Sequence, residues 1–312
     1  MSQNSQMASG SITDFRESLW KKIWRNKHSY LLMAPFLTFF LIFTLLPVLI
    51  SFILSFTYFN MLQFPEWRGW MNYVRLFLDD DIMIIAVRNT LIFAFLTGPV
   101  SYVLCLFFAW FINDLPPKLR ALFTVIFYAP SISGTVFVIW SFIFSSDAYG
   151  LINGALMKWG ILHEPVKWLL DPQYTIWVLI LVQLWLSLGT GFLAFIAGLQ
   201  GVDQNLYEAG AIDGISNRFQ ELWYITLPSM APQLMFGAVI QIIGAFSVGS
   251  ISMTLAGFPS TNYSAETIIT HIIDYGQIRY EMGYASAIAT MLFIAMFFSQ
   301  RIITKLISRI GS

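Results

Sequence analysis

Uncharged polar side chains inside long apolar stretches of this chain are of types that can bind a sugar. In one stretch, Gln183, Ser187 and Thr190 are spaced i, i+4 and i+7, so on a regular helix they share one face. Amides and hydroxyls donate hydrogen bonds to the hydroxyl groups of a sugar and accept hydrogen bonds from them. This face is therefore a candidate part of a neutral solute pathway.

A second apolar stretch carries Gln241, Phe246 and Ser247. An aromatic ring offers a flat apolar surface to the C–H face of a sugar, and Gln241 supplies an amide. On a regular helix Phe246 points well away from Gln241, so both can face one ligand only where the helix is locally unwound. The alternative in both stretches is helix–helix packing, where small and polar residues also concentrate. The sequence leaves both interpretations open.

A polar segment between two apolar stretches is the third candidate. It reads Tyr207-Glu-Ala-Gly-Ala-Ile-Asp-Gly214 and continues through Arg218 to Ile225-Thr-Leu-Pro228. Asp203 or Asn205 can cap a helix start by accepting backbone N–H bonds, while a glycine such as Gly214 ends a helix. We therefore predict a short helix here, with Pro228 opening the next apolar stretch.

The side chains of this short helix suit contact with another protein. Glu208 lies in the first turns, where a negative charge is stabilised, and it can pair with a cation of a partner. Ala209 and Gly210 form a thin face that another surface can approach closely. Asp213 comes directly before the terminating glycine, Gly214.

Composition indicates that most of the chain lies in a membrane. Of its 312 residues, 57% are hydrophobic and 11% are charged, against about 25% charged in a soluble domain. Unbroken apolar runs without alternation favour helices over a membrane barrel. Pro35, Pro47, Pro99 and Pro130 lie inside these runs and are expected to kink their helices. Six runs approach the ~20 residues that cross a bilayer, near 30–57, 89–112, 120–145, 175–198, 231–255 and 284–303.

The distribution of cations predicts the orientation. With the N-terminus inside the cell, 11 of the 17 Lys and Arg residues fall in inside segments and 6 fall in outside loops. Cytoplasmic segments carry the excess of cations, so we expect both termini and the Glu208 segment to be cytoplasmic. Arg16 to Lys27 has five cations, with Trp20 and Trp24 at helical spacing. It is interpreted as an amphipathic stretch on the membrane face or as a plain polybasic flank.

Several kinds of chemistry are absent from the sequence. It contains no P-loop, dinucleotide fingerprint, metal-ligand spacing or nucleophile elbow, so we expect no catalytic or metal-binding residue. Charged residues lie outside the apolar runs or in their end turns, which leaves no coupling-ion site of the kind that secondary carriers use. The net charge of zero does not suggest a nucleic-acid partner. Cys105 is expected to be an inert hydrophobe, the run 79–81 to start a helix, and His28, His163 and His271 to be solvated.

The segment from Glu208 to Pro228 resembles the EAA loop of the permease subunits of ABC importers. Further matches resemble the MalF-type subgroup of sugar permeases, and the resemblance spans residues 30 to 305. These matches are Met33-Ala-Pro-Phe36 with Phe43 and Pro47, Asn89-Thr90, Gly150-Leu-Ile-Asn153 and Trp168-Leu169. The resemblance implies an all-α polytopic membrane protein with six transmembrane helices of the MetI/MalF-like type.

The resemblance also implies partners and a division of labour. It implies a second, MalG-like permease, two ATP-binding subunits that hold ATP and Mg, and an extracytoplasmic solute-binding protein. No cofactor is expected in this chain. Tyr207, Glu208, Ala209, Gly210, Asp213, Gly214 and Arg218 would then couple it to the ATPase subunits. Solute would pass by alternating access, in the cell membrane of a bacterium or archaeon.

Two departures from the family pattern lie in this loop. The third position is Gly210 where alanine is usual, and the interval from Gly214 to Ile225 is one residue longer than usual. The extra residue is expected to turn Ile225, Leu227 and Pro228 relative to the short helix.

We divide the chain into a cytoplasmic segment 1–29, a six-helix domain 30–305 with the coupling loop at 203–228, and a cytoplasmic tail 306–312. The predicted function is import of a sugar, with an oligosaccharide favoured. The alternatives are an ABC permease for a polyol, phosphodiester or peptide, or a stand-alone secondary carrier. A membrane-embedded enzyme is the reading with least support.

Overall fold

The structure is a computed structural model that describes residues 24–134 and 136–308. Most of the predicted amphipathic stretch and residues 309–312 of the tail lie outside the described residues. The chain forms two compact units, divided between Ile53 and Leu54.

From Lys27 onward the first unit is a single run of helix. It consists of α2 (Lys27–Phe40), a π-helical turn η2 (Leu41–Leu45) and most of α3 (Leu46–Leu54). The π turn ends two residues before Pro47, whose ring and missing N–H disturb the preceding turn of a helix. Together these elements form a 28-residue helix long and apolar enough to cross a membrane, as the first apolar run predicts.

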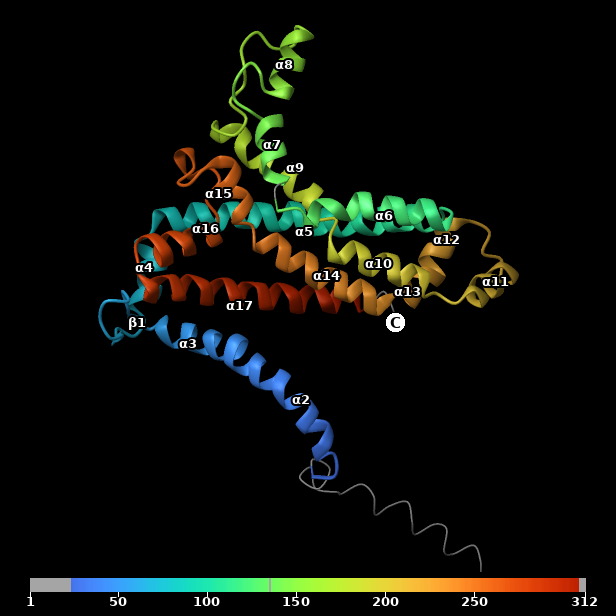
Figure 1. Cartoon of the computed structure of the whole chain (residues 1–312), viewed down its shortest axis with the longest axis horizontal. Coiled ribbons are helices and arrows are strands. Elements are labelled where there is room, and N and C mark those ends of the chain that lie inside the picture. Colours follow the sequence, from blue (N-terminus) through green and yellow to red (C-terminus); the bar gives the residue numbers. More distant parts are fainter. Residues whose placement is uncertain (1–23, 135, 309–312) are drawn as a thin grey trace, which may run out of the picture. The chain divides into compact units, whose positions relative to one another are not determined.

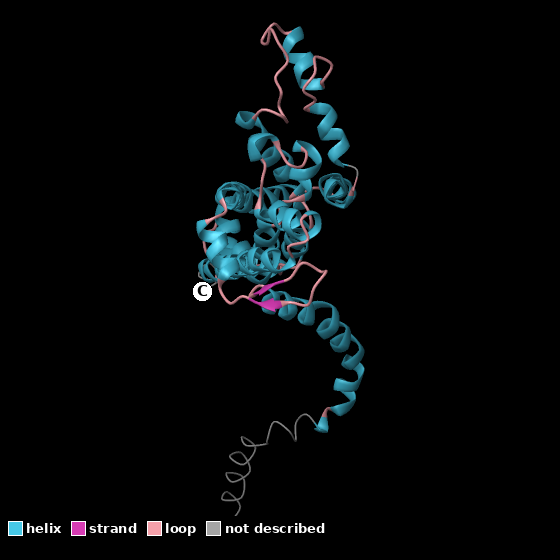
Figure 2. Cartoon of the chain, turned by 90° about the vertical axis from the view of Figure 1, so that its left-hand side faces the viewer, coloured by secondary structure: helices cyan, strands magenta, loops and turns pink. Residues whose placement is uncertain are grey.

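The second unit begins with a small hairpin, drawn in magenta in Figure 2. Strand β1 (Thr57–Tyr58) pairs antiparallel with β2 (Glu66–Trp67), and Thr57 lies opposite Trp67. Helices α4 (Met71–Leu78) and α5 (Asp81–Asn113) follow. Asp80 caps α5 by accepting a hydrogen bond from the Met83 N–H, which confirms that the acidic run starts a helix. Pro99 does not interrupt α5.

The remaining elements are mostly helices. They are α6 (Pro117–Ile132), α7 (Val136–Ile143), α8 (Leu151–Lys158), α9 (Pro172–Leu186), α10 (Thr190–Gln200), α11 (Gln204–Ile212), α12 (Arg218–Glu221), η3 (Leu222–Thr226), α13 (Leu227–Ser229), α14 (Ala231–Phe246), α15 (Ser250–Ala256), η4 (Thr261–Tyr263), α16 (Ile268–Ile273), η5 (Asp274–Ile278) and α17 (Met282–Ile307).

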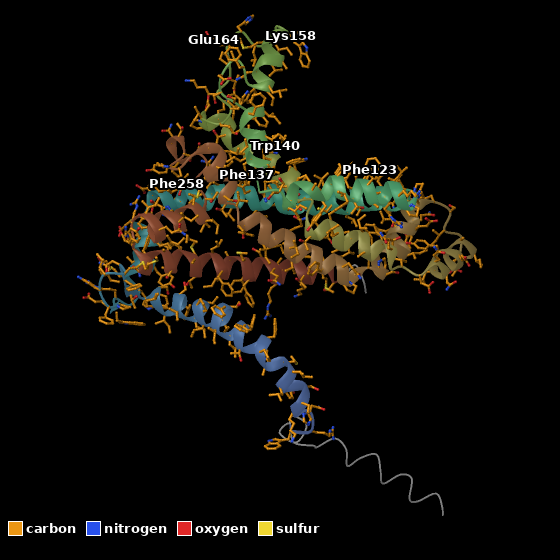
Figure 3. The ribbon with its side chains drawn as sticks, viewed as in Figure 1. Phe123, Phe137, Trp140, Lys158, Glu164 and Phe258 are labelled. Atoms are coloured by element: carbon orange, nitrogen blue, oxygen red, sulfur yellow. The ribbon has the colours of Figure 1, made fainter. Side chains whose placement is uncertain are left out.

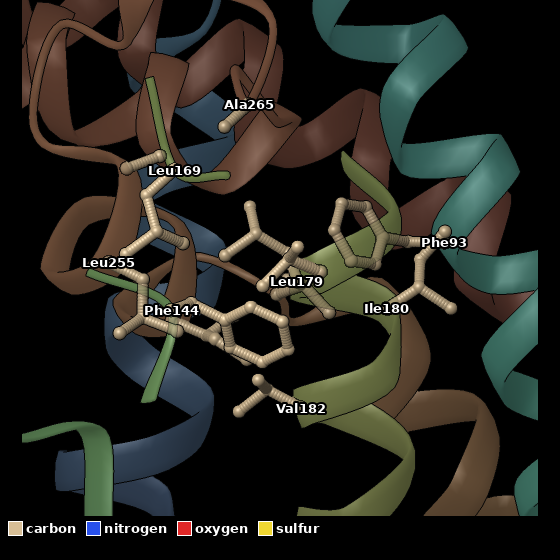
Figure 4. Close-up of a cluster of buried hydrophobic side chains, with 12 residues drawn as sticks. Phe93, Phe144, Leu169, Leu179, Ile180, Val182, Leu255 and Ala265 are labelled. Atoms are coloured by element: carbon tan, nitrogen blue, oxygen red, sulfur yellow. The ribbon is translucent and has the colours of Figure 1, made fainter. Parts of the chain in front are cut away.

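Helices α5, α10, α14 and α17 pack against one another and form the centre of the second unit (Figure 1). Apolar side chains fill the space between them. One buried cluster joins α5 and α9 to α15, with Phe93, Leu179 and Leu255 among its members (Figure 4). A second cluster joins α5, α14 and α17, and a third joins α5, α10 and α14.

The number of apolar helices agrees with the predicted spans. Four described helices are long and apolar enough to cross a membrane, and six are reached if each of two bent pairs counts as one span. The third predicted span is such a pair, because α6 and α7 meet at 86° after Pro130.

Two further predicted spans are interrupted, at positions that the sequence analysis did not single out as breaks. The fourth span breaks at 187–189, between α9 and α10, and the fifth breaks at 247–249, between α14 and α15. Gly189 and Gly249 have non-helical backbone angles at these breaks, and glycine weakens a helix because it has the largest backbone freedom to lose. The fifth span begins at Ala231, after an 83° bend that follows Ser229.

Candidate functional site: the coupling loop

The predicted short helix is α11, and the sequence signals for its two ends are confirmed. Asp203 caps its start by accepting a hydrogen bond from the Asn205 N–H at 3.0 Å. Gly214 follows its end with φ +93°, a conformation that glycine adopts without a Cβ penalty. The N–H of Ile215 donates to the Gly210 carbonyl at 2.9 Å, and the N–H of Gly214 donates to the Ala211 carbonyl at 3.4 Å. This pair of bonds is a Schellman C-cap.

The inner face of α11 is held by its own chain. Gly210 is buried, and a Cβ built on it would lie 2.5 Å from Ile225 Cδ1 and 3.2 Å from Ile215 Cδ1. The Tyr207 and Thr226 hydroxyls are 2.9 Å apart and form a hydrogen bond. The thin face at Gly210 therefore packs against Ile225 of the same chain. From the sequence we expected this face to be approached by the surface of another protein.

The π-helical turn η3 explains how the longer interval is accommodated. A π turn holds one residue more than an α turn, and η3 covers Leu222–Thr226 within the lengthened segment. Ile225 and Thr226 face α11. The expected turn of Ile225, Leu227 and Pro228 relative to the short helix, compared with the usual family pattern, stays a prediction.

The outer face of α11 has no contact within the described residues that would cover it. Glu208, Ala209 and Asp213 are exposed, and the apolar Ile212 is 88% exposed.

Arg218 joins the loop to the end of α5. It forms an ion pair with Asp114, and its guanidinium lies 5.7 Å from the centre of the Trp110 ring. The Trp110 ring is also 5.3 Å from the Phe219 ring. Between the loop and the helix ends lies a polar cleft of about 480 Å³, with Asn113, Arg120, Gln204 and Glu221 on its walls. This end of the unit is called the coupling-loop end below.

The predicted solute-pathway residues differ in exposure. Gln241 and Phe246 are buried, and the Gln241 amide donates to Cys105 Sγ and to the Ser187 carbonyl, each at 3.2 Å. Thr190 and Ser247 are exposed, whereas Gln183 and Ser187 are half-buried. The face that Gln183, Ser187 and Thr190 would share does not persist, because the helix breaks between the last two. The role of all six in a pathway stays a prediction.

Residues that carry the family resemblance outside the loop hold long turns in place. Asn89 Nδ2 donates to three backbone carbonyls between residues 263 and 266. Asn153 is fully buried. Its Nδ2 donates to the carbonyls of Ser145, Asp147 and Val166, and its Oδ1 accepts from the Val166 N–H and from Trp168 Nε1. The tip of the segment that Asn153 closes carries Lys158 and Glu164 (Figure 3).

One buried pair of charged side chains is not predicted by the sequence. His271, expected to be solvated, is 1% exposed and pairs with Asp80 at 2.9 Å. Nothing in the local sequence around either residue signals the pair, because 191 positions separate them. No group of three or more His, Cys, Asp or Glu side chains able to hold a metal occurs among residues 24–134 and 136–308.

Several described helices are long and apolar enough to cross a membrane, and a short loop helix is docked on the same chain. These features define a polytopic membrane protein. Comparison with known proteins identifies the group. The chain is 31% identical over 296 residues to the arabinooligosaccharides transport system permease protein AraP of Bacillus subtilis, which covers 93% of this chain and 92% of the relative. It is 29% identical over 276 residues to the trehalose/maltose transport system permease protein MalF of Thermococcus litoralis, covering 87% and 91%. The chain belongs to the family of permease subunits of ABC transporters.

Solved structures agree with this assignment. The fold matches a chain from a bacterial ABC transporter involved in import of the acidic polysaccharide alginate, with TM-score 0.74, 25% identity, and coverage of 95% of this chain and 100% of the other. A second structure of the alginate transporter, in complex with an alginate pentasaccharide-bound periplasmic protein, matches with TM-score 0.74 and 26% identity, covering 95% and 99%. No family model matches the chain.

Proposed function

We propose that this chain is the permease subunit of an ABC importer for a sugar, with an oligosaccharide favoured, in the plasma membrane. The relatives support a sugar, since they are named for transport of arabinooligosaccharides and of trehalose/maltose. Exposed Thr190 and Ser247 at the helix breaks provide hydroxyls of the kind that bind sugar hydroxyls.

The observation that carries the coupling role is the two-sided character of α11. Its inner face is fixed to η3 by the Gly210–Ile225 contact and by the Tyr207–Thr226 hydrogen bond. Its outer face, with Glu208 and Ile212, is free to meet a partner. Movement of α11 would therefore be transmitted through η3 and α13 to α14, which packs directly on α5, α10 and α17.

The proposed partners follow from this arrangement. Two ATP-binding subunits would hold ATP and Mg, and one of them would receive the outer face of α11. A second, MalG-like permease would complete the pathway, and an extracytoplasmic solute-binding protein would deliver the sugar. This chain would carry no ATPase site of its own, and solute would cross by alternating access, with both termini of the chain in the cytoplasm.

Reconstitution tests the proposal. The chain is purified with the products of neighbouring genes, placed in liposomes, and supplied with labelled arabino-oligosaccharides, maltose or alginate oligosaccharides. We expect uptake that requires ATP inside and a binding protein outside, with one of the three sugars preferred. Uptake by this chain alone would contradict the proposal, and uptake confined to a polyol, phosphodiester or peptide would contradict the sugar assignment.

A further inference from the structure

A buried ionic cluster lies at the end of the second unit opposite the coupling loop, where α16 and α4 pack against α17 (Figure 1). We call Asp80, Glu266, His271 and Tyr284 the His271 cluster. His271 Nε2 is 2.9 Å from Asp80 Oδ2, and the Tyr284 hydroxyl donates to the same oxygen at 2.6 Å. His271 Nδ1 is 3.7 Å from Glu266 Oε1, at ion-pair distance. Asp80, Glu266 and His271 are 8%, 3% and 1% exposed.

Each member comes from a different part of the chain. Asp80 caps α5, His271 lies in α16, and Tyr284 lies in the first turn of α17. Glu266 ends the loop that Asn89 fixes to α5. The cluster therefore joins α16 and the loop before it to the ends of two spans.

The charges around the cluster are mostly paired with one another. Arg75 forms an ion pair with Glu281 at 2.5 Å and lies 4.3 Å from the centre of the Tyr284 ring. Arg279 forms an ion pair with Asp274 at 2.8 Å. The Tyr275 ring contacts the His271 ring, with 4.9 Å between centres, and lies beneath both arginines. His271 is thus the group placed to neutralise Asp80 and Glu266.

A neutral imidazole would leave two buried carboxylates facing it without a cation, and burying an unpaired charge is costly. Burial alone would lower the pKa of His271, but the hydrogen bond to Asp80 and the charges of Asp80 and Glu266 outweigh it and raise the pKa to about 9. Burial likewise opposes ionisation of Asp80, yet the hydrogen bonds from His271, Tyr284 and the Met83 N–H hold the pKa of Asp80 well below its usual range.

A small cavity lies beside the cluster. It has a volume of about 70 Å³ and is lined by Glu266, His271, Asp274 and Arg279, among others. A cavity needs roughly 10–15 Å³ to admit a water molecule, so this one can hold water next to the cluster.

We propose that His271 is a proton-binding site, and that its bound proton holds α16 and the loop ending at Glu266 onto the ends of α5 and α17. When the proton leaves, Asp80 and Glu266 lose their counter-charge, and this part of the permease loosens. The inference concerns the stability of the fold and does not depend on which solute is carried.

The sign of the pH dependence follows from linkage. A histidine whose pKa is raised on folding contributes stability that is fully present below about pH 6.5 and is lost as pH rises through about 9. The assembled complex should therefore hold a constant melting temperature below about pH 6 and lose stability between about pH 6.5 and 9, with little further loss from this group above that range. Hydrogen exchange of residues 257–274, corrected for the intrinsic rate at each pH, should increase over the same range.

Three variants test the site. His271→Gln keeps a polar side chain but binds no proton, so its melting temperature should be lower at pH 7 and should lack the alkaline loss. Asp80→Asn removes one counter-charge and should move the alkaline midpoint down by about half a pH unit or more. A contacting opposite charge shifts a pKa by about 1–3, and only the upper limit of the pH range of the loss moves with it. His163→Gln, at an exposed histidine in another loop, is the matched control and should follow the wild type.

An alkaline loss that persists unchanged in His271→Gln would overturn the proposal. Should that variant fail to assemble, Asp80→Asn and Glu266→Gln decide, because an alkaline midpoint that stays at the wild-type pH in both also overturns it.

Discussion

Gly210 and Ile225 are in contact across the coupling loop, and the space above the Gly210 Cα is occupied by the end of the Ile225 side chain. The contact joins the helix that faces outward to the turn that leads into the membrane. Its tightness makes the size of the residue at position 210 a sensitive test of coupling.

Substitutions of graded size at Gly210 should have graded effects. Gly210→Ala requires only the flexible Cδ1 of Ile225 to move, so ATP-driven uptake should stay close to wild type. Gly210→Leu should separate α11 from η3, at a cost of about 1–3 kcal/mol for overpacking, so that ATP hydrolysis continues while uptake falls. Both are measured in proteoliposomes.

The matched control is Ala211→Leu, which adds the same side chain at an exposed position of the same helix. Equal loss of uptake in the control would show that the Ile225 contact is not the cause. Restoration of uptake by adding Ile225→Ala to Gly210→Leu would support it.

Tyr207 and Thr226 should behave as a coupled pair. Tyr207→Phe removes the hydroxyl hydrogen bond, whose net contribution is about 0.5–1.5 kcal/mol, while Thr226 keeps its bond to the Glu221 carbonyl. Thermal unfolding of Tyr207→Phe, Thr226→Val and the double variant gives the interaction energy. Strict additivity of the two single effects would exclude the pair as a link between α11 and η3.

The Arg218–Asp114 ion pair should matter more for position than for stability. Both side chains are partly exposed, and such pairs contribute about 0–1 kcal/mol. Arg218→Asp should therefore reduce uptake with little change in melting temperature, and Asp114→Arg in the same chain should restore part of it. Failure of the reversed pair to restore uptake would assign Arg218 to a contact with another subunit.

Substitutions at Gln241 and Thr190 should distinguish a role in helix packing from a role in solute binding. Gln241 is buried and hydrogen-bonded to Cys105 and Ser187, so Gln241→Leu should lower the melting temperature and leave the apparent KM for the sugar unchanged. Thr190 is exposed, so Thr190→Val should raise that KM without loss of stability. The opposite assignment of effects would identify Gln241 as the solute ligand.

The fold was predictable because its signals are local. Apolar runs of bilayer length mark the spans, and Asp203 and Gly214 mark the ends of α11 with little help from the rest of the chain. The interruptions at Gly189 and Gly249 were not predicted, since single glycines occur in continuous helices as well as in broken ones. Their effect depends on what packs beside them.

The coupling loop was predictable as a helix but not as a contact. The sequence places Gly210 on a thin face without saying which surface approaches it, and Ile225 is far enough along the chain to be missed. The π turn η3 likewise has no signature in the local sequence. The pair of Asp80 and His271 could not be predicted from the sequence either, because only the tertiary fold brings the two residues together.

Asn153 has a consequence for how the permease can diversify. The partners of its five hydrogen bonds all lie between residues 145 and 168. The hydrogen bonds that hold this segment closed are therefore within the segment itself. The tip around Lys158 and Glu164 can then change in length and charge while the spans keep their packing. This segment can therefore be exchanged as a unit. Replacing it with the matching segment of a relative, with the asparagine retained, would change the tip and leave the membrane domain unchanged.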